Sequence, residues 1–425
     1  MFIKRLHLKN FRCYESLDMD FEKKLTVIVG ENGKGKTAIF DSLAIALAPY
    51  LEAFDIAGTK IRPKDVRRIP VYKDDGMHIS RMESRYPVSI AVEAESVGGE
   101  PLYASDVFSA DGSVEVSENL KAFGSRLLRE EGTVLPVLAY YGTSRIWVDS
   151  NLLNERDKSL QERKVGYEFC LEPSSSYNTF GKWFGYISQC SSSCGELIYK
   201  AVQKAVDRCL QSTGLSGISY SRELESLVVY HPDMGELIVD DLSDGSRCII
   251  SMAADLAYRM VRLNPFLGER SVIDTPGVVL IDEVDMHLHP SWQQTILLDL
   301  QQAFPNIQFI VTTHSPQVLS SVPAETIRIL VWGKNFEGIK LVDFSLGAES
   351  TQLLQEIQNV STRIGALPIV QDLKRYLELI SKDQWDTEEA LELRKKLDAW
   401  AKGHEPALLR ADMDIRLRKF RRKRS

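Results

Sequence analysis

A glycine-rich loop near the N-terminus constrains the fold of this chain more than any other feature. Residues 25–29 form a short apolar run, and the loop that follows fits G-x-x-x-x-G-K-[ST] at every fixed position. Backbone N–H groups of such a loop surround phosphates, and the next helix directs its positive end at them. We therefore expect a strand, a nucleotide-binding loop and a buried helix, the loop comprising Gly30, Glu31, Asn32, Gly33, Lys34, Gly35, Lys36 and Thr37.

Two side chains of this loop have specific predicted roles. Lys36 is expected to contact the β- and γ-phosphates of ATP, and the Thr37 hydroxyl is expected to bind Mg²⁺. The motif therefore predicts ATP and Mg²⁺ as the cofactors of the chain.

Two further apolar runs end in polar side chains. Residues 278–281 lead into Asp282 and Glu283, and residues 307–313 lead into His314. A carboxylate at the end of a buried strand can orient Mg²⁺, which we assign to Asp282, and Glu283 is placed to act as general base toward water. His314 is expected to contact the γ-phosphate, because ligands of open α/β sheets bind at the carboxyl ends of strands.

A fourth motif, Leu-Ser-Asp-Gly-Ser-Arg at residues 242–247, precedes an apolar helix. Its serine hydroxyl and glycine amide, from Ser243 and Gly245, form an anion site at a helix N-terminus. The motif resembles the LSGGQ signature of ABC ATPases. In that family the signature faces the γ-phosphate bound by the other subunit, so the resemblance implies that two copies of the chain clamp ATP between them.

The opening of the chain narrows this resemblance. Asn10-Phe-Arg12 is similar to the start of the RecF, SMC and OLD branch of the family, which makes Arg12 a further implied nucleotide contact. Residues 140–145, 263–265, 292–294 and 304–309 resemble the PtuA family, the ATPases of the Septu anti-phage system, and a related ATPase accompanies some retrons. That resemblance implies a slow, regulatory ATPase that forms a multimer and controls a separate HNH nuclease.

The predicted fold is α/β. We expect an ABC-type P-loop ATPase head over residues 1–345, with a mixed sheet, flanking helices and an antiparallel lobe that includes hairpins at residues 87–116. A loop-rich, partly helical insertion is expected at about residues 150–215, and a helical region with a basic tail at residues 346–425. We assign no glutamine to the Q-loop that ABC ATPases carry.

Two basic segments of the chain each have more than one possible role. The net charge of −7 gives no global reason to expect nucleic acid, so any such contact must be local. The stretch at residues 60–68 is either a solvated loop or a contact with nucleotide, nucleic acid or a partner. The tail at residues 416–425 binds a phosphate backbone, binds an acidic partner or remains solvated.

Further sequence patterns indicate the cellular compartment of the chain and whether it carries a nuclease site. We find no signal peptide and no apolar run long enough to cross a membrane, and the six cysteines lack paired spacing, so we expect a cytoplasmic protein with reduced thiols. Asp412 and Asp414 have the spacing of a nuclease metal pair but lie in a charged, helical tail, and His287 and His289 are explained better by the D-loop of the ABC family than by a metal site. We therefore expect no nuclease activity in this chain. The alternative function is a RecF-like DNA repair or loading ATPase without a nuclease partner; a transporter ATPase is disfavoured.

Overall fold

The computed structural model describes residues 1–72, 79–130, 132–143, 163–173, 177–188, 193–333 and 336–422. It divides into two compact units, Met1–Leu353 and Leu354–Ser425, each of which is described by itself. Among the described residues, no helix is long and apolar enough to cross a membrane.

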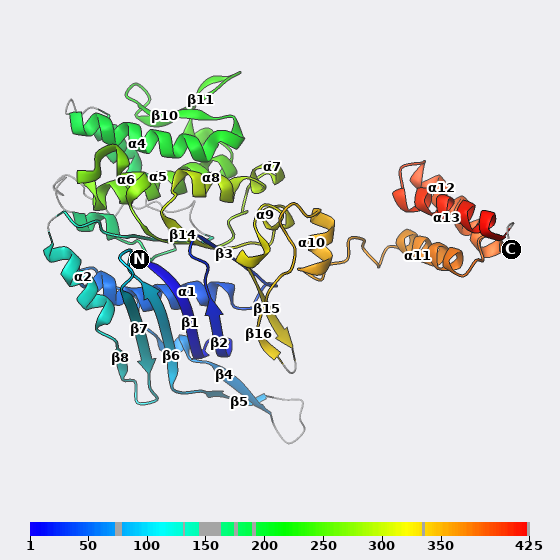
Figure 1. The fold of residues 1–425 in the computed structure, drawn as a ribbon, viewed down its shortest axis with the longest axis horizontal. Helices are drawn as coiled ribbons and strands as arrows, with labels where there is room; N and C mark the ends of the chain where they lie inside the picture. Colours follow the sequence, from blue (N-terminus) through cyan, green and yellow to red (C-terminus); the bar gives the residue numbers. More distant parts are fainter. Residues whose placement is uncertain are drawn as a thin grey trace. The chain divides into compact units, whose positions relative to one another are not determined.

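A six-stranded sheet forms the centre of the first unit (Figure 1). Its strand order is β16-β15-β3-β14-β13-β9, and all strands except β16 run parallel. The carboxyl ends of the parallel strands therefore meet along one edge of the sheet. The strands are β3 (Leu25–Val29), β9 (Val137–Tyr141), β13 (Gly277–Ile281), β14 (Ile307–Thr312), β15 (Ile327–Gly333) and β16 (Phe336–Lys340).

A five-stranded antiparallel sheet forms the predicted lobe, in the order β2-β1-β6-β7-β8. Along β6, buried residues alternate with partly exposed ones, as expected for a strand with one face on the core. Helix α1 (Lys36–Glu52), nearly all of which is buried, contacts β6, β7 and α2 (Asn119–Arg129). The strands are β1 (Phe2–Phe11), β2 (Tyr14–Asp20), β6 (Val88–Glu95), β7 (Pro101–Phe108) and β8 (Val114–Val116).

Helices and a small sheet complete this unit. Helix α5 (Asp244–Leu263) is almost entirely buried, and a buried network ties it to the central sheet: the Tyr141 hydroxyl and Arg259 Nε both donate to Asp255, at 2.7 and 2.8 Å. The other elements are α3 (Tyr177–Ile187), α4 (Ser193–Leu210), α6 (Ser271–Asp274), α7 (Pro290–Gln293), α8 (Ile296–Ala303), α9 (Pro316–Leu319), and the sheet β10 (Ser216–Ser221), β11 (Ser226–His231) and β12 (Gly235–Ile238). The division between the two units falls within α10 (Ser350–Glu356).

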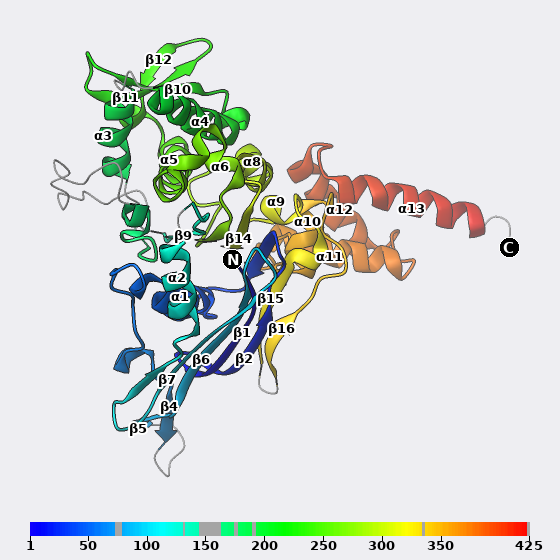
Figure 2. The same ribbon diagram turned by 60° about the vertical axis from the view of Figure 1, so that its left-hand side comes forward.

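A two-stranded ribbon, β4 (Arg68–Tyr72) and β5 (Ile79–Ser84), pairs only with itself among the described strands. It lies at one end of the first unit, and the β10–β12 sheet lies at the opposite end in both views (Figures 1 and 2).

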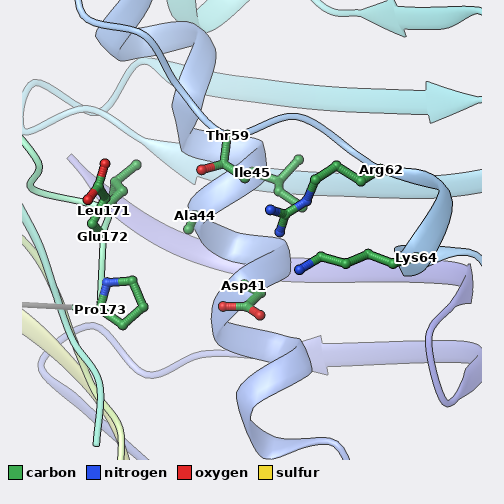
Figure 3. A pocket seen from close by; sticks show the side chains of 9 residues that line it. All are labelled: Asp41, Ala44, Ile45, Thr59, Arg62, Lys64, Leu171, Glu172 and Pro173. Carbon is green, nitrogen blue, oxygen red and sulfur yellow. The ribbon is translucent and has the colours of Figure 1, made fainter. Parts of the chain in front are cut away.

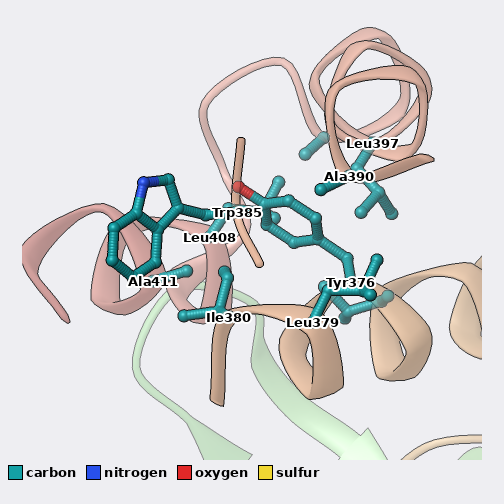
Figure 4. Packing of buried hydrophobic residues seen from close by; sticks show 10 residues of the cluster. Tyr376, Leu379, Ile380, Trp385, Ala390, Leu397, Leu408 and Ala411 are labelled. Atoms are coloured by element: carbon teal, nitrogen blue, oxygen red, sulfur yellow. The ribbon is translucent and has the colours of Figure 1, made fainter. Parts of the chain in front are cut away.

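The second unit contains α11 (Pro368–Ser381), α12 (Glu388–Ala401) and α13 (Pro406–Arg422). These helices enclose their own apolar core, in which Tyr376 and Trp385 are the largest side chains (Figure 4). Asp412 forms an ion pair with Arg394 of α12, and Asp414 pairs with Arg418. The predicted helical region is therefore a packed three-helix unit.

Asp106 of β7 makes the stability of the first unit depend on pH. Its side chain is 3% exposed, and Oδ1 has no hydrogen-bond partner among the described residues. Burial, with a smaller contribution from Glu52, raises the pKa of Asp106 to about 7. Because the folded state holds this proton more tightly than the unfolded state, stability falls as the pH rises from about 4 to about 7 and stays flat above that.

We therefore expect Asp106→Asn to raise the thermal midpoint at pH 8 by several degrees. The pKa rise corresponds to roughly 4 kcal/mol at most, and the benefit should shrink to about a quarter of its pH 8 value near pH 4.5. Glu115→Gln, on the neighbouring exposed strand β8, is the matched control. A gain of equal size at both pH values would contradict this explanation.

Candidate nucleotide site

The glycine-rich loop joins β3 to α1 as predicted. Gly35 has a φ of 86°, and a Cβ at this position would lie 2.6 Å from both Cys13 Sγ and the Tyr14 hydroxyl. Only glycine fits here, because both the left-handed backbone and the close packing exclude a side chain. The Tyr14 hydroxyl also donates to the Lys34 carbonyl at 3.1 Å, so the β1–β2 turn fixes the loop from the side of the lobe.

Lys36 lies beneath the loop. Its Nζ donates to the carbonyls of Gly30 and Glu31, at 2.7 and 3.2 Å, and the residue is 7% exposed. Burial lowers the pKa of Lys36, and Asp282, Glu283 and Asp285 partly oppose this effect. A desolvated ammonium next to an open loop gains by contact with an anion.

The ends of three strands bring the predicted metal-binding residues together. Asp282, directly after β13, accepts hydrogen bonds from Thr37 Oγ1 at 2.8 Å and from Thr312 Oγ1 at 2.6 Å. Thr37 lies in the first turn of α1 and Thr312 ends β14. A hydroxyl and a carboxylate this close supply the hard oxygen ligands that Mg²⁺ prefers, so these residues fit the ion.

Glu283 has an unusual backbone conformation. Its φ is 51°, in the left-handed region, and its N–H donates to Thr312 Oγ1 at 2.7 Å. The Val284 N–H also donates to the Thr312 carbonyl, at 2.9 Å. A non-glycine residue in this region costs free energy and is kept only where its surroundings fix it, as often happens at functional sites. Here Thr312 fixes Asp282 and Glu283 together.

His314 follows β14, in the segment that leads to α9. The neighbouring Thr313 hydroxyl donates to Asp285, and the Ser315 hydroxyl donates to Gln293 Oε1 at 2.7 Å. These bonds tie the His314 segment to residues 285–293, which contain the histidines assigned to the D-loop and are called the D-loop below. Within that loop, His289 accepts from the Ser291 N–H at the start of α7, which gives this histidine a structural role.

The predicted signature lies at the start of α5. Ser243 is exposed and caps the helix by accepting from the Ser246 N–H. Gly245 is buried against the D-loop, since a Cβ there would lie 2.4 Å from the His287 carbonyl oxygen. Among the described residues, neither Ser243 nor Gly245 is hydrogen-bonded to residues 30–37, so a single chain does not join the signature to its own loop.

Arg12 is anchored beside α1. It has a φ of 49°, its Nη1 donates to Asp41 Oδ2 at 2.6 Å, and its Nε donates to Asp65 Oδ1 at 2.9 Å. Asp41 also accepts from the Tyr140 hydroxyl, at 3.3 Å. Asp41 borders a pocket of about 480 Å³, into which Arg62 and Lys64 extend from the opposite wall (Figure 3).

Sequence reasoning missed several residues of this site. Thr312 lies within a predicted strand and carries no local signal of a functional role. The contacts of Asp41 and Asp65 with Arg12 join segments that are far apart in the sequence. Trp332, at the end of β15, lies 5.5 Å from the Tyr14 ring and 5.9 Å from Lys34 Nζ, beside the loop. The rule that ligands bind at strand ends was the available signal for Thr312 and Trp332.

The rule that ligands bind at the carboxyl ends of strands also indicates where the unassigned Q-loop lies. β9 neighbours β13, and the Asp282 N–H donates to the Tyr141 carbonyl at 2.8 Å, so Gly142 and Thr143 emerge at the edge that carries Asp282. Thr143 is exposed there. Residues 144–162, which include Ser144, Arg145 and part of the predicted insertion, lie outside the described residues.

Comparison with known proteins agrees with this architecture. A family model described as an AAA domain matches residues 5–176, and one described as an AAA domain, putative AbiEii toxin, Type IV TA system, matches residues 222–320. The crystal structure of an SMC head bound to the C-terminal winged-helix domain of ScpA superposes with a TM-score of 0.51 at 15% identity, covering 80% of this chain and 98% of that chain.

Two relatives in sequence are similar over most of the chain. The probable ATPase of retron Ec83 from Escherichia coli is 27% identical, over 97% of this chain and 86% of the relative. Septu protein PtuA from Bacillus mycoides strain KBAB4 is 25% identical over 78% of this chain, but the match spans only 40% of that PtuA.

The fold and the site therefore define an ATPase with an ABC-type, SMC-like head. Its homologues include Septu protein PtuA and retron ATPases, so the predicted resemblance and fold class are confirmed.

Proposed function

We propose that this ATPase binds Mg-ATP between two copies of itself and, as part of an anti-phage defence complex, uses the nucleotide state to control a partner HNH nuclease. The observation that supports the site most strongly is the hydrogen-bonded group Thr37, Asp282, Thr312 and Glu283, which unites the phosphate loop with two strand ends.

The residues of the nucleotide site have different roles in the proposed chemistry. Thr37 and Asp282 would hold Mg²⁺, which would supply positive charge against the phosphates. Lys36 leaves its two carbonyl partners to contact the β- and γ-phosphates, and His314 contacts the γ-phosphate. Glu283 orients and deprotonates the attacking water. The loop amides of residues 30–37 and the N-terminus of α1 bind the remaining phosphate oxygens.

A second copy completes the site in this proposal. Ser243 is exposed at the N-terminus of a long buried helix, where its hydroxyl and the nearby amides can accept an anion from outside the chain. Gly245 fixes this end of α5 to the D-loop, and the D-loop is tied to the His314 segment. Binding of a second head would therefore act directly on the segment beside the γ-phosphate.

The defence role rests on the relatives. PtuA is the ATPase of the Septu system and the retron protein is a probable ATPase, and their alignments cover most of this chain. Closure of two heads around ATP changes the surface that the pair presents, which is a means of restraining or releasing a bound nuclease.

The test is a pull-down of tagged Glu283→Gln chain from its native host with ATP, compared with tagged Lys36→Ala chain. Mass spectrometry and native mass are expected to show a small HNH-type protein in a multimer with the first variant. Recovery of the chain alone would contradict the proposal of a partner HNH nuclease. Recovery with replication or repair proteins would favour a DNA-loading ATPase.

A further inference from the structure

Helix α13 carries apolar side chains on two faces, and only one of these faces is packed. Leu408 and Ala411 belong to the apolar core of the second unit (Figure 4). Leu409, Met413 and Leu417 follow one another at intervals of four residues, so they share the opposite face, which we call the α13 face. Their exposed fractions are 54, 65 and 59%. A helix that is apolar on more than one face is normally covered on each of them, so the α13 face has the character of a packing surface.

The C-terminal half of α13 receives little apolar support from its own unit. Among the described residues of the helix, the last one that packs against the core is Ile415, yet the helix continues to Arg422. None of the described residues 416–420 is buried, and Arg418 holds this stretch through an ion pair with Asp383. Two turns of helix without apolar packing are marginal in water, because so short a segment gains few contacts to offset its ordering. An element packed on the α13 face would stabilise them.

Positive charge borders the α13 face. By helical periodicity Arg410 and Arg416 lie on opposite sides of it, with Lys419 beyond Arg416, and all three are exposed. Across residues 406–425 the sequence contains eight Lys or Arg and two Asp or Glu. The last five residues contribute four of the basic side chains and neither of the acidic ones, so the positive excess does not depend on their placement.

The two carboxylates of α13 are engaged on other sides of the helix. Asp412 forms an ion pair with Arg394 of α12, and Asp414 pairs with Arg418. Because both acids already have a cationic partner, the charge beside the α13 face stays positive. It therefore attracts acidic side chains from outside the unit.

This combination of apolar and cationic side chains favours an acidic amphipathic helix as the partner. The apolar side of such a helix covers the α13 face, while its Asp and Glu side chains meet Arg410 and Arg416. Nucleic acid phosphates would contact the arginines but leave the apolar side chains exposed. A membrane-bound amphipathic helix keeps its other side in water, whereas the other side of α13 belongs to the core of the unit. Pairing with the α13 face of a second copy is disfavoured by like charge.

We propose that the α13 face is a docking surface for an acidic amphipathic helix of a partner protein, which packs along α13 as a fourth helix of the second unit. Docking extends the apolar packing of α13 beyond Ile415 and attaches the partner to the ATPase. This surface involves no residue of the nucleotide site, so its test is independent of the proposed function.

The test is fluorescence anisotropy of a labelled synthetic peptide, built from repeats of Leu-Glu-Glu-Leu-Leu-Glu-Glu, titrated with the full-length chain. Wild type is expected to bind, and Met413→Gln/Leu417→Gln is expected to bind at least ~10-fold more weakly, because two apolar contacts are lost. Glutamine is a good helix former, so the substitution does not act through helix propensity. The matched control is Leu224→Gln/Met234→Gln, which replaces the same residue types, also more than half exposed, on the first unit. It should stay within about twofold of wild type.

The contribution of charge is measured with Arg410→Gln/Arg416→Gln. This variant is expected to bind the acidic peptide about fivefold more weakly at low salt, and the difference should shrink at high salt because exposed ion pairs are screened. A peptide in which lysine replaces every glutamate should bind at least ~10-fold more weakly than the acidic peptide.

Several results would overturn the proposal. They are absence of peptide binding by wild type up to about 100 μM chain, equal loss in the control on the first unit, and equal binding of the lysine peptide. Self-association of wild type that Met413→Gln/Leu417→Gln abolishes, measured by sedimentation equilibrium, would assign the face to a second copy. Binding to phosphatidylserine vesicles but not to the peptide would assign it to a membrane. If the glutamine pair lowers the melting temperature, Met413→Ala/Leu417→Ala, which has a higher helix propensity, takes its place.

Discussion

Replacing Glu283 with Gln is expected to lower the rate of ATP hydrolysis by about 10²–10⁴-fold. The amide keeps the shape of the side chain but cannot accept a proton from water. The main-chain bond from residue 283 to Thr312 Oγ1 is unaffected, so the Thr37–Asp282–Thr312 group that binds Mg-ATP is retained. Nucleotide affinity should therefore stay within a few-fold of wild type.

Phosphate release in the steady state and binding of a fluorescent ATP analogue measure the two effects. Glu325→Gln, on an exposed turn just before the amino end of β15 and so not at the carboxyl ends of the strands, is the matched control and should resemble wild type in both. If Glu283→Gln hydrolysed ATP at the wild-type rate, the general base would have to be another residue. Asp285, which accepts from Thr313, would be the first to examine.

Replacing Lys36 with Ala is expected to weaken ATP binding by at least ~100-fold and to abolish hydrolysis. The Lys36 ammonium is buried, and burial lowers its pKa, so it is poorly solvated before the phosphates arrive. A charge-assisted contact contributes more to the binding free energy in such a desolvated site than the same contact does in water. Its loss costs about 3 kcal/mol or more.

Lys34→Ala provides a close control within the same loop. The Lys34 side chain extends over Trp332, whereas the main-chain carbonyl of Lys34 accepts from the Tyr14 hydroxyl. The substitution therefore removes the contact with Trp332 and keeps the main-chain bond to Tyr14. Isothermal titration calorimetry should show a change of less than about fivefold for Lys34→Ala. Similar losses for both variants would indicate that the net charge of the loop, and not the placement of Lys36, governs binding.

The sequence predicted the elements that depend on local pattern. The phosphate loop, the runs ending in Asp282 and His314, and the alternating strands of the lobe each carry a short-range signal, and the parallel sheet follows from apolar runs that end in polar side chains. The three strand ends meet because parallel strands share one edge.

Other features depend on contacts between distant segments and carry no such signal. Thr312 reads as an ordinary strand residue until β14 is placed beside β13, where its hydroxyl bridges Asp282 and the Glu283 N–H. The left-handed backbone of Glu283 is imposed by that environment, not by its residue type. The burial of Asp65 beneath Arg12, and the projection of the ribbon that follows it, likewise appear only in three dimensions.

The central claim, that ATP is bound between two copies of the chain, is tested most directly by mixing two inactive variants. Lys36→Ala lacks the phosphate loop contact and Ser243→Arg blocks the signature, so each alone should be inactive. An equal mixture forms mixed dimers in which one site has an intact loop from one copy and an intact signature from the other. We predict recovery of about a quarter of the wild-type hydrolysis rate. A mixture as inactive as its components would contradict a site shared between two copies.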